Sequence, residues 1–252
     1  MRSISVFGNQ DLDPIPVGTL VGDLLHLTRI SGRDPQTAVL GDDIRAQLKN
    51  AYANMKLAVE NAGGTLDNVA HVSMYWANWS QDREEMNPPW LEVFPDAHDR
   101  PTYKFMPAPN LPEGERIAFE CYAVMGARRR LLAVEGVAHT NPIPLGVRIG
   151  GYVFSSRMLP YDPSTGKAAE GAEAQAKFLF ANTAAMLAEG GMSWKDVVYG
   201  RAFLADPATQ RPLVDEQWQR VLPDPANRPA LNRVKYGGGP LQVMLEVIAG
   251  QD

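Results

Sequence analysis

The sequence has 252 residues with 24 Lys or Arg against 29 Asp or Glu, a formal net charge of −5. This length predicts two domains, and the acidic balance argues against nucleic-acid binding. No apolar segment is long enough for a membrane span, the N-terminus lacks the apolar stretch of a signal peptide, and the lone Cys121 excludes an internal disulfide framework. We expect a cytoplasmic protein that handles small molecules and binds neither nucleic acid nor membrane.

The first half of the chain predicts five elements. The first element is rich in strand-forming residues and is predicted to be a strand. The second has apolar residues at helical spacing, which predicts a helix, and the third alternates apolar and polar residues, which predicts a strand. In that third element His71, Ser73 and Tyr75 share one face. The elements, in chain order, are a strand over 20–31, a helix over 44–59 that ends at Gly63-Gly64, a strand over 71–76, a helix over 84–94 shortened by Pro88-Pro89, and a strand over 117–124.

The second half of the chain repeats this pattern at an offset of 128 residues, from Arg29 to Arg157. Further matched pairs are Asp34-Pro35 with Asp162-Pro163, Ala53-Asn54 with Ala181-Asn182, Trp90 with Trp218, and Arg100-Pro101 with Arg228-Pro229. The corresponding elements are a strand over 147–156, a helix over 172–187, a strand over 199–204, a helix over 213–222 and a strand over 242–249. Each copy is longer than a solenoid or propeller repeat and is therefore predicted to be a small domain.

We predict domains at residues 1–126 and 129–252. The basic run Arg128-Arg129-Arg130 lies at the join, where we expect a solvated linker, with a nucleic-acid patch as the alternative. The element order predicts an α+β unit in which two helices pack on one face of a mixed sheet. The other face is expected to be covered by self-association or by the other copy.

Several segments carry a resemblance to a known family. Ala62–Val69 closes the long helix, an Arg-Pro pair precedes a loop that ends in Leu111-Pro112, and the second copy contains Val153–Ser156 and Asp162–Gly166. Their order and spacing resemble the Rid family, the reactive intermediate deaminases, across essentially the whole chain. The resemblance implies two chorismate-mutase-like units, assembly with pockets between units, and hydrolysis of enamines or imines such as 2-aminoacrylate to keto acids and ammonia.

Both copies depart from the family pattern at its hallmark positions. Active members are expected to carry an Arg two residues after the Pro of the Arg-Pro pair and a Glu at the start of the last strand. The Arg position is Tyr103 in the first copy and Leu231 in the second, and the Glu position is Ala118 and Met244. These departures favour a non-catalytic metabolite-binding protein as the alternative to a deaminase.

Arginines at unusual places are the candidates for binding a substrate carboxylate. Arg29 and Arg157 occupy matching positions where the family usually has a Gly beside its pocket, and Arg201 lies within a strand. A guanidinium suits a carboxylate because its planar fork donates two parallel hydrogen bonds. The alternatives are a salt-bridged surface arginine at a strand end and an exposed sheet-edge arginine.

Two matched carboxylates and a tyrosine are the candidates for catalysis. Glu120 and Glu246 each lie within an otherwise apolar strand, where burial would disturb the pKa of the carboxyl in a way that suits a general base. A paired, structural carboxylate is the alternative. Tyr103 could donate one hydrogen bond to an anion, and Lys104 beside it could supply charge, with a polar loop as the alternative.

His139 is a further candidate for substrate binding because it lies in a loop of the second copy. The histidines do not stand at metal-ligand spacing with a Cys or carboxylate, so we predict neither a metal nor another cofactor. Cys121 is expected to be an inert core thiol.

From these observations and the family resemblance we predict a hydrolytic deaminase that acts on a carboxylate-bearing enamine or imine. Its substrate is expected to resemble 2-aminoacrylate or, by family analogy, the 2-aminomuconate of aromatic catabolism. We expect a homo-oligomer, with a trimer favoured over a dimer.

Overall fold

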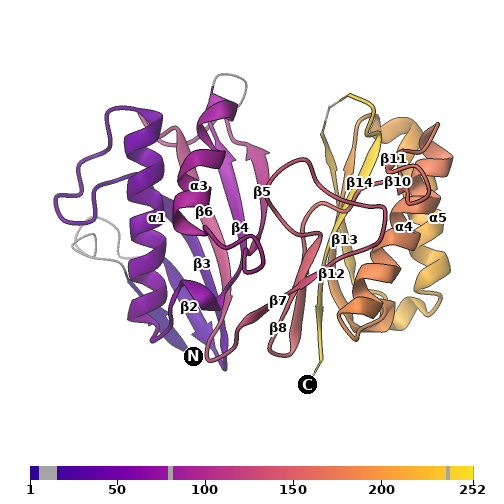
Figure 1. Ribbon diagram of the computed structural model, residues 1–252, viewed down its shortest axis with the longest axis horizontal. Coiled ribbons are helices and arrows are strands. Elements are labelled where there is room, and N and C mark those ends of the chain that lie inside the picture. Colours follow the sequence, from indigo (N-terminus) through magenta and orange to yellow (C-terminus); the bar gives the residue numbers. More distant parts are fainter. Residues whose placement is uncertain (6–15, 79–81, 237–238, 252) are drawn as a thin grey trace. The chain divides into compact units, whose positions relative to one another are not determined.

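The structure is a computed structural model that describes residues 1–5, 16–78, 82–236 and 239–251. The chain forms two compact units, Met1–Arg129 and Arg130–Asp252. Each unit is an α+β assembly of one six-stranded sheet with helices on one of its faces (Figure 1). None of the helices in the described part of the chain combines the length and hydropathy that a bilayer crossing requires.

The sheet of the first unit has the strand order β1-β2-β3-β6-β4-β5. Its strands are β1 (Arg2–Ile4), β2 (Gly18–Val21), β3 (Leu24–Ser31), β4 (Val69–Trp76), β5 (Thr102–Pro107) and β6 (Ile117–Val124). Strands β4 and β5 run parallel, and the other neighbouring pairs run antiparallel. The helical elements are α1 (Ile44–Asn61), η1 (Leu66–Asn68), η2 (Arg83–Glu85) and α3 (Asn87–Val93).

The sheet of the second unit has the order β13-β12-β14-β9-β8-β7. Its strands are β7 (Arg129–Leu132), β8 (Gly146–Ile149), β9 (Tyr152–Ser155), β12 (Val197–Leu204), β13 (Ala230–Lys235) and β14 (Val243–Gly250). A small hairpin pairs β10 (Tyr161–Asp162) with β11 (Lys167–Ala168). The helical elements are α4 (Ala172–Glu189), η3 (Trp194–Asp196), α5 (Pro207–Val221) and η4 (Pro225–Asn227). Taken from β7 to β13, this sheet repeats the topology of the first, which confirms the predicted tandem α+β duplication.

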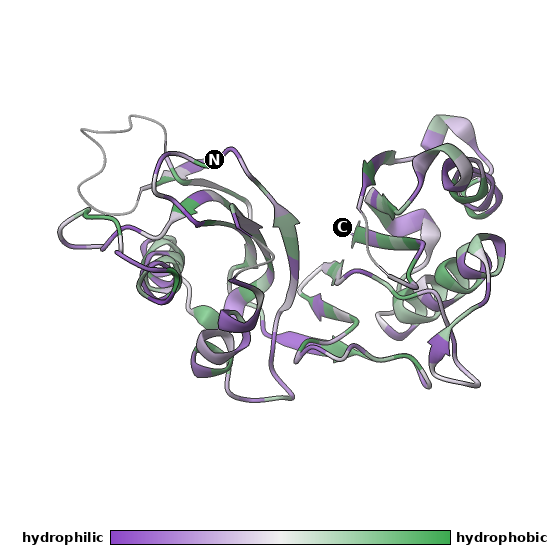
Figure 2. Cartoon of the chain, turned by 90° about the horizontal axis from the view of Figure 1, so that it is seen from above, coloured by the Kyte–Doolittle hydropathy of each residue, from purple (hydrophilic) through white to green (hydrophobic). Residues whose placement is uncertain are grey.

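The hydrophobic core of each unit lies between the sheet and its helices. In the first unit, the Tyr52 ring of α1 meets the Phe119 ring of β6 edge-on, with 4.9 Å between centroids. In the second unit, Trp218 of α5 packs so closely over β12 that a Cβ on Gly200 would lie 2.6 Å from the indole. Figure 2 shows hydrophilic and hydrophobic residues interleaved along the helices, as expected for helices that are packed on one side only.

Two residue pairs that the repeat shares have structural roles. The Asn54 side chain donates to the carbonyls of Ser31 and Arg33 at 3.0 and 2.8 Å, and Asn182 makes the equivalent bonds after β9. Arg100 donates to the Phe94 carbonyl at 2.8 Å, just beyond the end of α3, and Arg228 does the same beyond α5. These side chains satisfy backbone carbonyls that would otherwise lack donors.

Both six-stranded sheets contain strands that the sequence analysis did not predict. The predicted strand over 20–31 is a hairpin of β2 and β3 that turns at Gly22, whose φ is +59°. The segment between the Arg-Pro pair and Leu111-Pro112 is expected to be a loop, but residues 102–107 form β5, whose charged residue and short length hide the alternation that places Tyr103 and Phe105 in the core. Strand β13 is its counterpart in the second unit. Helix α5 begins at Pro207, earlier than predicted, because the Asp206 side chain caps it and proline is tolerated in a first turn.

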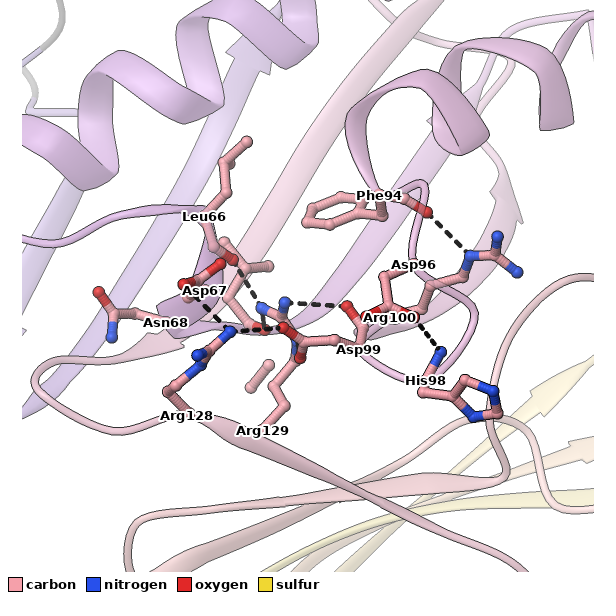
Figure 3. A network of polar contacts seen from close by, with 12 residues as sticks. Leu66, Asp67, Asn68, Phe94, Asp96, His98, Asp99, Arg100, Arg128 and Arg129 are labelled. Atoms are coloured by element: carbon pink, nitrogen blue, oxygen red, sulfur yellow. Dashed lines mark hydrogen bonds and ion pairs between the residues drawn. The ribbon is translucent and has the colours of Figure 1, made fainter.

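The basic run at the join is solvated at Arg128 and Arg130, whose side chains are 73% and 54% exposed, but not at Arg129. The side chain of Arg129 is 2% exposed and donates to the carbonyls of Leu66 and Val69 at 2.6 and 2.8 Å and to the Asp99 carboxylate at 3.1 Å (Figure 3). Arg128 also pairs with Asp99, at 3.3 Å. Arg128 and Arg129 therefore tie the end of the first unit to its own loops.

Substitution of Arg129 by Ala is expected to lower the free energy of unfolding by about 3 kcal/mol, because it removes the buried donor to the Leu66 and Val69 carbonyls and leaves the Asp99 carboxylate paired with Arg128 alone. Arg130→Ala is the matched control: Arg130 and its partner Glu189 are 54% and 51% exposed, so the loss should be at most about 1 kcal/mol. Denaturant unfolding of both variants measures the difference. Equal losses would contradict a buried anchoring role for Arg129.

Candidate functional site

The helix-free face of each sheet, opposite the helices, gathers polar side chains from the central strands. In the first unit His71, Ser73 and Tyr75 of β4 share this face, while alternate residues such as Met74 point toward α1, where the Tyr52 hydroxyl lies 4.0 Å from the Met74 sulfur. In the second unit Tyr199, Arg201 and Phe203 of β12 share it, because the alternating Ala202 and Leu204 belong to the helix-side core. The alternation predicted for these strands is thus present in the structure.

Glu120 of β6 forms the centre of a carboxylate cluster on the first unit, made of His26, Tyr75, Glu120 and Tyr122. The Tyr75 hydroxyl donates to Glu120 Oε2 at 2.6 Å, and His26 Nε2 lies 2.9 Å from Oε1. The Tyr122 hydroxyl adds a longer bond to Oε1, at 3.3 Å. The His26 and Tyr122 rings are stacked with 4.5 Å between centroids. Three donors therefore converge on one carboxylate.

These donors decide the ionisation of Glu120. Burial by itself would raise the pKa of Glu120, but the hydrogen bonds from His26 and Tyr75, helped by the charge of the buried Lys104, lower that pKa from 4.5 to about 2. Glu120 is consequently ionised at neutral pH and is a weak proton acceptor there. Its geometry suits it to hold its partners in place.

A buried polar chain lies beside this cluster. His71 Nδ1 is 2.8 Å from Thr102 Oγ1, which donates to the Ala70 carbonyl at 3.3 Å, and Ser73 Oγ lies 3.4 Å from His71 Nε2. His71, Ser73 and Thr102 are all buried. The chain satisfies polar groups between β4 and β5, which is a structural task.

Arg157 occupies the corresponding region of the second unit, where its guanidinium packs against two aromatic rings. Its Cζ atom is 4.5 Å from the Phe203 centroid and 4.1 Å from the Tyr236 centroid. Burial lowers the pKa of Arg157, while the nearby Tyr236 and Glu246 oppose that shift. The two ring centroids are 5.8 Å apart and the rings are nearly perpendicular, so they form a corner against which the guanidinium packs. The planar fork of its N–H donors matches the geometry of a carboxylate.

Arg201 and Glu246 lie directly opposite each other on β12 and β14. Glu246 is 3% exposed, and the Arg201 guanidinium lies 5.6 Å from the Tyr199 ring. In the first unit the same register places Ser73 opposite Glu120. The second unit therefore carries a guanidinium where the first carries a hydroxyl.

His139 is held next to Arg157 by Ser156. Its Nε2 atom is 2.6 Å from Ser156 Oγ, which in turn donates to the Leu145 carbonyl at 2.9 Å. Because the single hydroxyl proton is used in that second bond, His139 Nε2 donates. Burial, and then the charge of Arg157, lower the pKa of His139 from 6.5 to about 4, so this imidazole is neutral at pH 7.

The structure brings four of the predicted site residues together in the second unit. We name them, with their neighbours, the guanidinium cluster: His139, Ser156, Arg157, Arg201, Tyr236 and Glu246. It also brings Glu120 and Lys104 together in the first unit. Lys104 lies on a strand and is buried, so the polar-loop alternative does not describe it.

Tyr103 and Arg29 are placed elsewhere. Tyr103 is 2% exposed on the helix side of the sheet, where its hydroxyl donates to Asn87 Oδ1 at 3.0 Å and its ring packs against Trp90. Arg29 is exposed and has a φ of +56°. Burial raises the pKa of the neighbouring Glu115, an effect that the charges of Arg33 and Arg29 oppose.

Sequence reasoning missed several members of the two clusters. Tyr75 and Phe203 lie on faces that the alternation identified, which was the available signal. His26 and Tyr236 gave no such signal, because their partners come from distant strands. Burial raises the pKa of the Cys121 thiol and so disfavours the reactive thiolate. Across the described residues, His, Cys, Asp and Glu side chains nowhere gather in a group of three or more that could hold a metal ion.

The architecture defines a class of protein, a tandem duplication of an α+β unit with polar clusters on its helix-free faces. The family model described as Endoribonuclease L-PSP matches residues 18–125 and again residues 138–249. The chain therefore belongs to this family, the Rid family, and carries two copies of its domain.

Individual relatives each correspond to part of the chain. A RutC family protein of Aquifex aeolicus is 29% identical over 115 residues, which are 43% of this chain and 91% of that protein. A 2-iminobutanoate/2-iminopropanoate deaminase of Salmonella typhimurium is 35% identical over 69 residues, 27% of this chain and 54% of the deaminase. The crystal structure of RidA from an Antarctic Psychrobacter is 28% identical, covers 49% of this chain and 100% of its own, and has a TM-score of 0.45.

Glu120 is expected to make stability pH-dependent. Its pKa falls on folding from 4.5 to about 2, so the ionised carboxylate stabilises the fold above pH 4.5, by up to about 3 kcal/mol, and this contribution disappears as the pH falls toward 2. Glu120→Gln should therefore be destabilised at pH 7 and should lose less further stability between pH 5 and pH 3. Denaturant unfolding at these pH values tests this, with the exposed Glu92→Gln as control. Parallel pH profiles for the wild type and Glu120→Gln would refute the assignment.

His139 is expected to titrate near pH 4 in an NMR titration of its imidazole resonances. The Arg157→Gln variant should raise this midpoint, because removal of a neighbouring positive charge favours protonation. An ordinary midpoint near 6.5 in the wild type would show that His139 is neither buried nor close to Arg157 in solution.

Proposed function

We propose that this protein is a hydrolytic deaminase of a carboxylate-bearing enamine or imine, and that the guanidinium cluster of the second unit holds the substrate carboxylate. The observation that carries this proposal is Arg157, whose guanidinium packs against both the Phe203 and the Tyr236 ring. A guanidinium held in this way loses little conformational freedom when it binds an anion, so more of its interaction energy contributes to affinity. Its plane matches that of a carboxylate.

The charges of the cluster favour a substrate with one carboxylate. Arg157 and Arg201 contribute two positive charges and Glu246 one negative charge, whereas His139 is neutral at pH 7. One bound carboxylate brings the cluster to neutrality. A second carboxylate would need another cation, so the balance supports a 2-aminoacrylate-like substrate over the dicarboxylate 2-aminomuconate of aromatic catabolism.

Hydrolysis of the C=N bond requires the protein mainly to position the substrate and the attacking water. Water adds to the carbon of a protonated C=N bond, and the collapse of the resulting carbinolamine releases ammonia and leaves a keto acid. Since this addition is intrinsically easy, anchoring of the carboxylate next to an ordered water supplies much of the required acceleration. The name of the Salmonella relative, a deaminase of 2-iminobutanoate and 2-iminopropanoate, supports the same reaction class.

A non-catalytic metabolite-binding protein is the second candidate function. The observation that favours it is the side-chain set at the hallmark positions: Tyr103 is packed in the core, and Leu231, Ala118 and Met244 supply neither a guanidinium nor a carboxylate. The guanidinium cluster would then carry an organic acid without converting it.

We further propose that the protein acts in the cytoplasm as a homo-oligomer, with a trimer ahead of a dimer. Family members assemble with pockets between units, and an isolated pair of units cannot close a ring of three.

Arg157→Lys is expected to lower kcat/KM for 2-iminopropionate by about 100-fold, because lysine keeps the charge but loses the planar fork. Ammonia release, coupled to detection of pyruvate, measures the effect. Arg29→Ala serves as the comparison, since Arg29 is exposed on the first unit, and it should retain activity. Unchanged activity in Arg157→Lys would contradict the proposed site. Absence of turnover in the wild type, together with saturable pyruvate binding that Arg157→Lys weakens, would establish the carrier function instead.

A further inference from the structure

His26 and Glu120 form a histidine–carboxylate pair on the helix-free face of the first unit. His26 comes from β3 and Glu120 from β6, with 2.9 Å between Nε2 and Oε1. The His26 side chain is 43% exposed and that of Glu120 is 19% exposed. The carboxylate is thus the inner member of the pair and the imidazole is the outer one.

The pair fixes the tautomer of the imidazole. Glu120 is ionised at neutral pH and only accepts hydrogen bonds, so neutral His26 carries its proton on Nε2 and keeps a lone pair on Nδ1. Stacking on Tyr122, with an angle of 13° between the rings, also fixes the ring plane. A carboxylate that orients a histidine in this manner is a common arrangement for general-base catalysis.

The charged and titratable groups around His26 come from three strands. Glu120 and Tyr122 lie on β6, Tyr75 on β4 and Lys104 on β5. The charges of Glu120 and Lys104 cancel, so this cluster has no net charge when His26 is neutral. It differs in this respect from the guanidinium cluster, and it is better suited to moving a proton than to holding an anion.

The second unit has lost this pair. Phe154 faces Ile248 at the position where His26 faces Tyr122, and Phe203 replaces Tyr75, although the carboxylate is kept as Glu246. An imidazole at this position is therefore not required to build the fold. The same comparison shows that a phenylalanine ring is tolerated there.

We propose that His26, oriented by Glu120, is a general base that moves a proton to and from the carbon next to the C=N or C=O group of a 2-imino or 2-keto acid. The substrate class rests on the deaminase function proposed above, because hydrolysis at carbon requires the imine and an enamine must first gain a proton on its neighbouring carbon. His26 is thus assigned as a catalytic residue, and Glu120 as a positioning residue that acts through it.

The proton transfer balances without a further reagent. His26 Nδ1 takes a proton from the carbon, the C–H electron pair forms a C=C bond, and the C=N pair moves to nitrogen, which gains a proton from water. The reverse sequence delivers the proton from His26 to the carbon and turns the enamine into the imine. With a keto acid the same step forms the enol.

The test is exchange of the pyruvate methyl protons for deuterium in D2O, followed by NMR with the full-length protein. The wild type is expected to exchange at least about 100-fold faster than buffer. His26→Phe, which keeps the ring stack, should fall to the background rate. The exposed Glu92→Gln should match the wild type. Exchange at the buffer rate in the wild type, or unchanged exchange in His26→Phe, would overturn the proposal.

The role of Glu120 has its own readout. Imidazole ¹⁵N shifts of His26 should show the Nε2–H tautomer in the wild type and a mixture in Glu120→Gln, with exchange slowed in that variant by about tenfold or more. An unchanged tautomer with unchanged exchange would show that Glu120 is merely structural.

The exchange assay is independent of the deaminase assay. Loss of ammonia release in Arg157→Lys with exchange intact would leave the His26 proposal standing. Conversely, ammonia release without any exchange in the wild type would contradict the His26 proposal and would still support the deaminase function.

Discussion

A carboxylate in the middle of the last strand of each unit is the constraint on which the polar chemistry of this protein depends. Glu120 and Glu246 occupy matching places in two otherwise apolar strands, and a charge there must be compensated because burial penalises the ionised form. The first unit compensates with hydroxyl and imidazole donors and with the charge of Lys104. The second unit places Arg201 on the facing strand. The choice of partner determines what each helix-free face can do.

Because the domain is duplicated, one chain contains both ways of compensating the buried carboxylate. The residues that both units share, such as Asn54 with Asn182 and Arg100 with Arg228, hydrogen-bond to backbone carbonyls and so preserve the fold. On the helix-free faces the copies differ in the partners of this carboxylate, since Arg201 takes the place of Ser73 and Phe203 that of Tyr75. The first unit has a neutral cluster suited to proton transfer, and the second has a positively charged cluster suited to an organic anion. The shared carboxylates thus have different partners in the two units, and those partners distinguish the candidate chemistry of each unit.

The sequence could predict a candidate site residue where the signal was local, but not where its contacting residues come from distant segments of the chain. His139 and Arg157 were identified because loops and strand ends reveal unusual polar residues. The packing of Arg157 against the Phe203 and Tyr236 rings was not predicted, because Tyr236 approaches only once β13 lies beside β12. Tyr103 was a candidate donor to an anion, but Thr102–Pro107 is a strand whose alternation turns that ring into the core. A local pattern cannot show which face of an unrecognised strand meets the helices.

The sequence by itself determined the tandem repeat, the family, the α+β class and the polar face of each central strand, because these follow from periodicity and from the spacing of matched motifs. Only the tertiary structure decided which polar residues act together. Strand register set Ser73 against Glu120 and Arg201 against Glu246. Packing also turned Arg129, the middle residue of the basic run, into an anchor, since it finds its acceptors more than fifty residues earlier or in a separate loop. Such pairings depend on long-range closure of the sheet, which no local sequence pattern encodes.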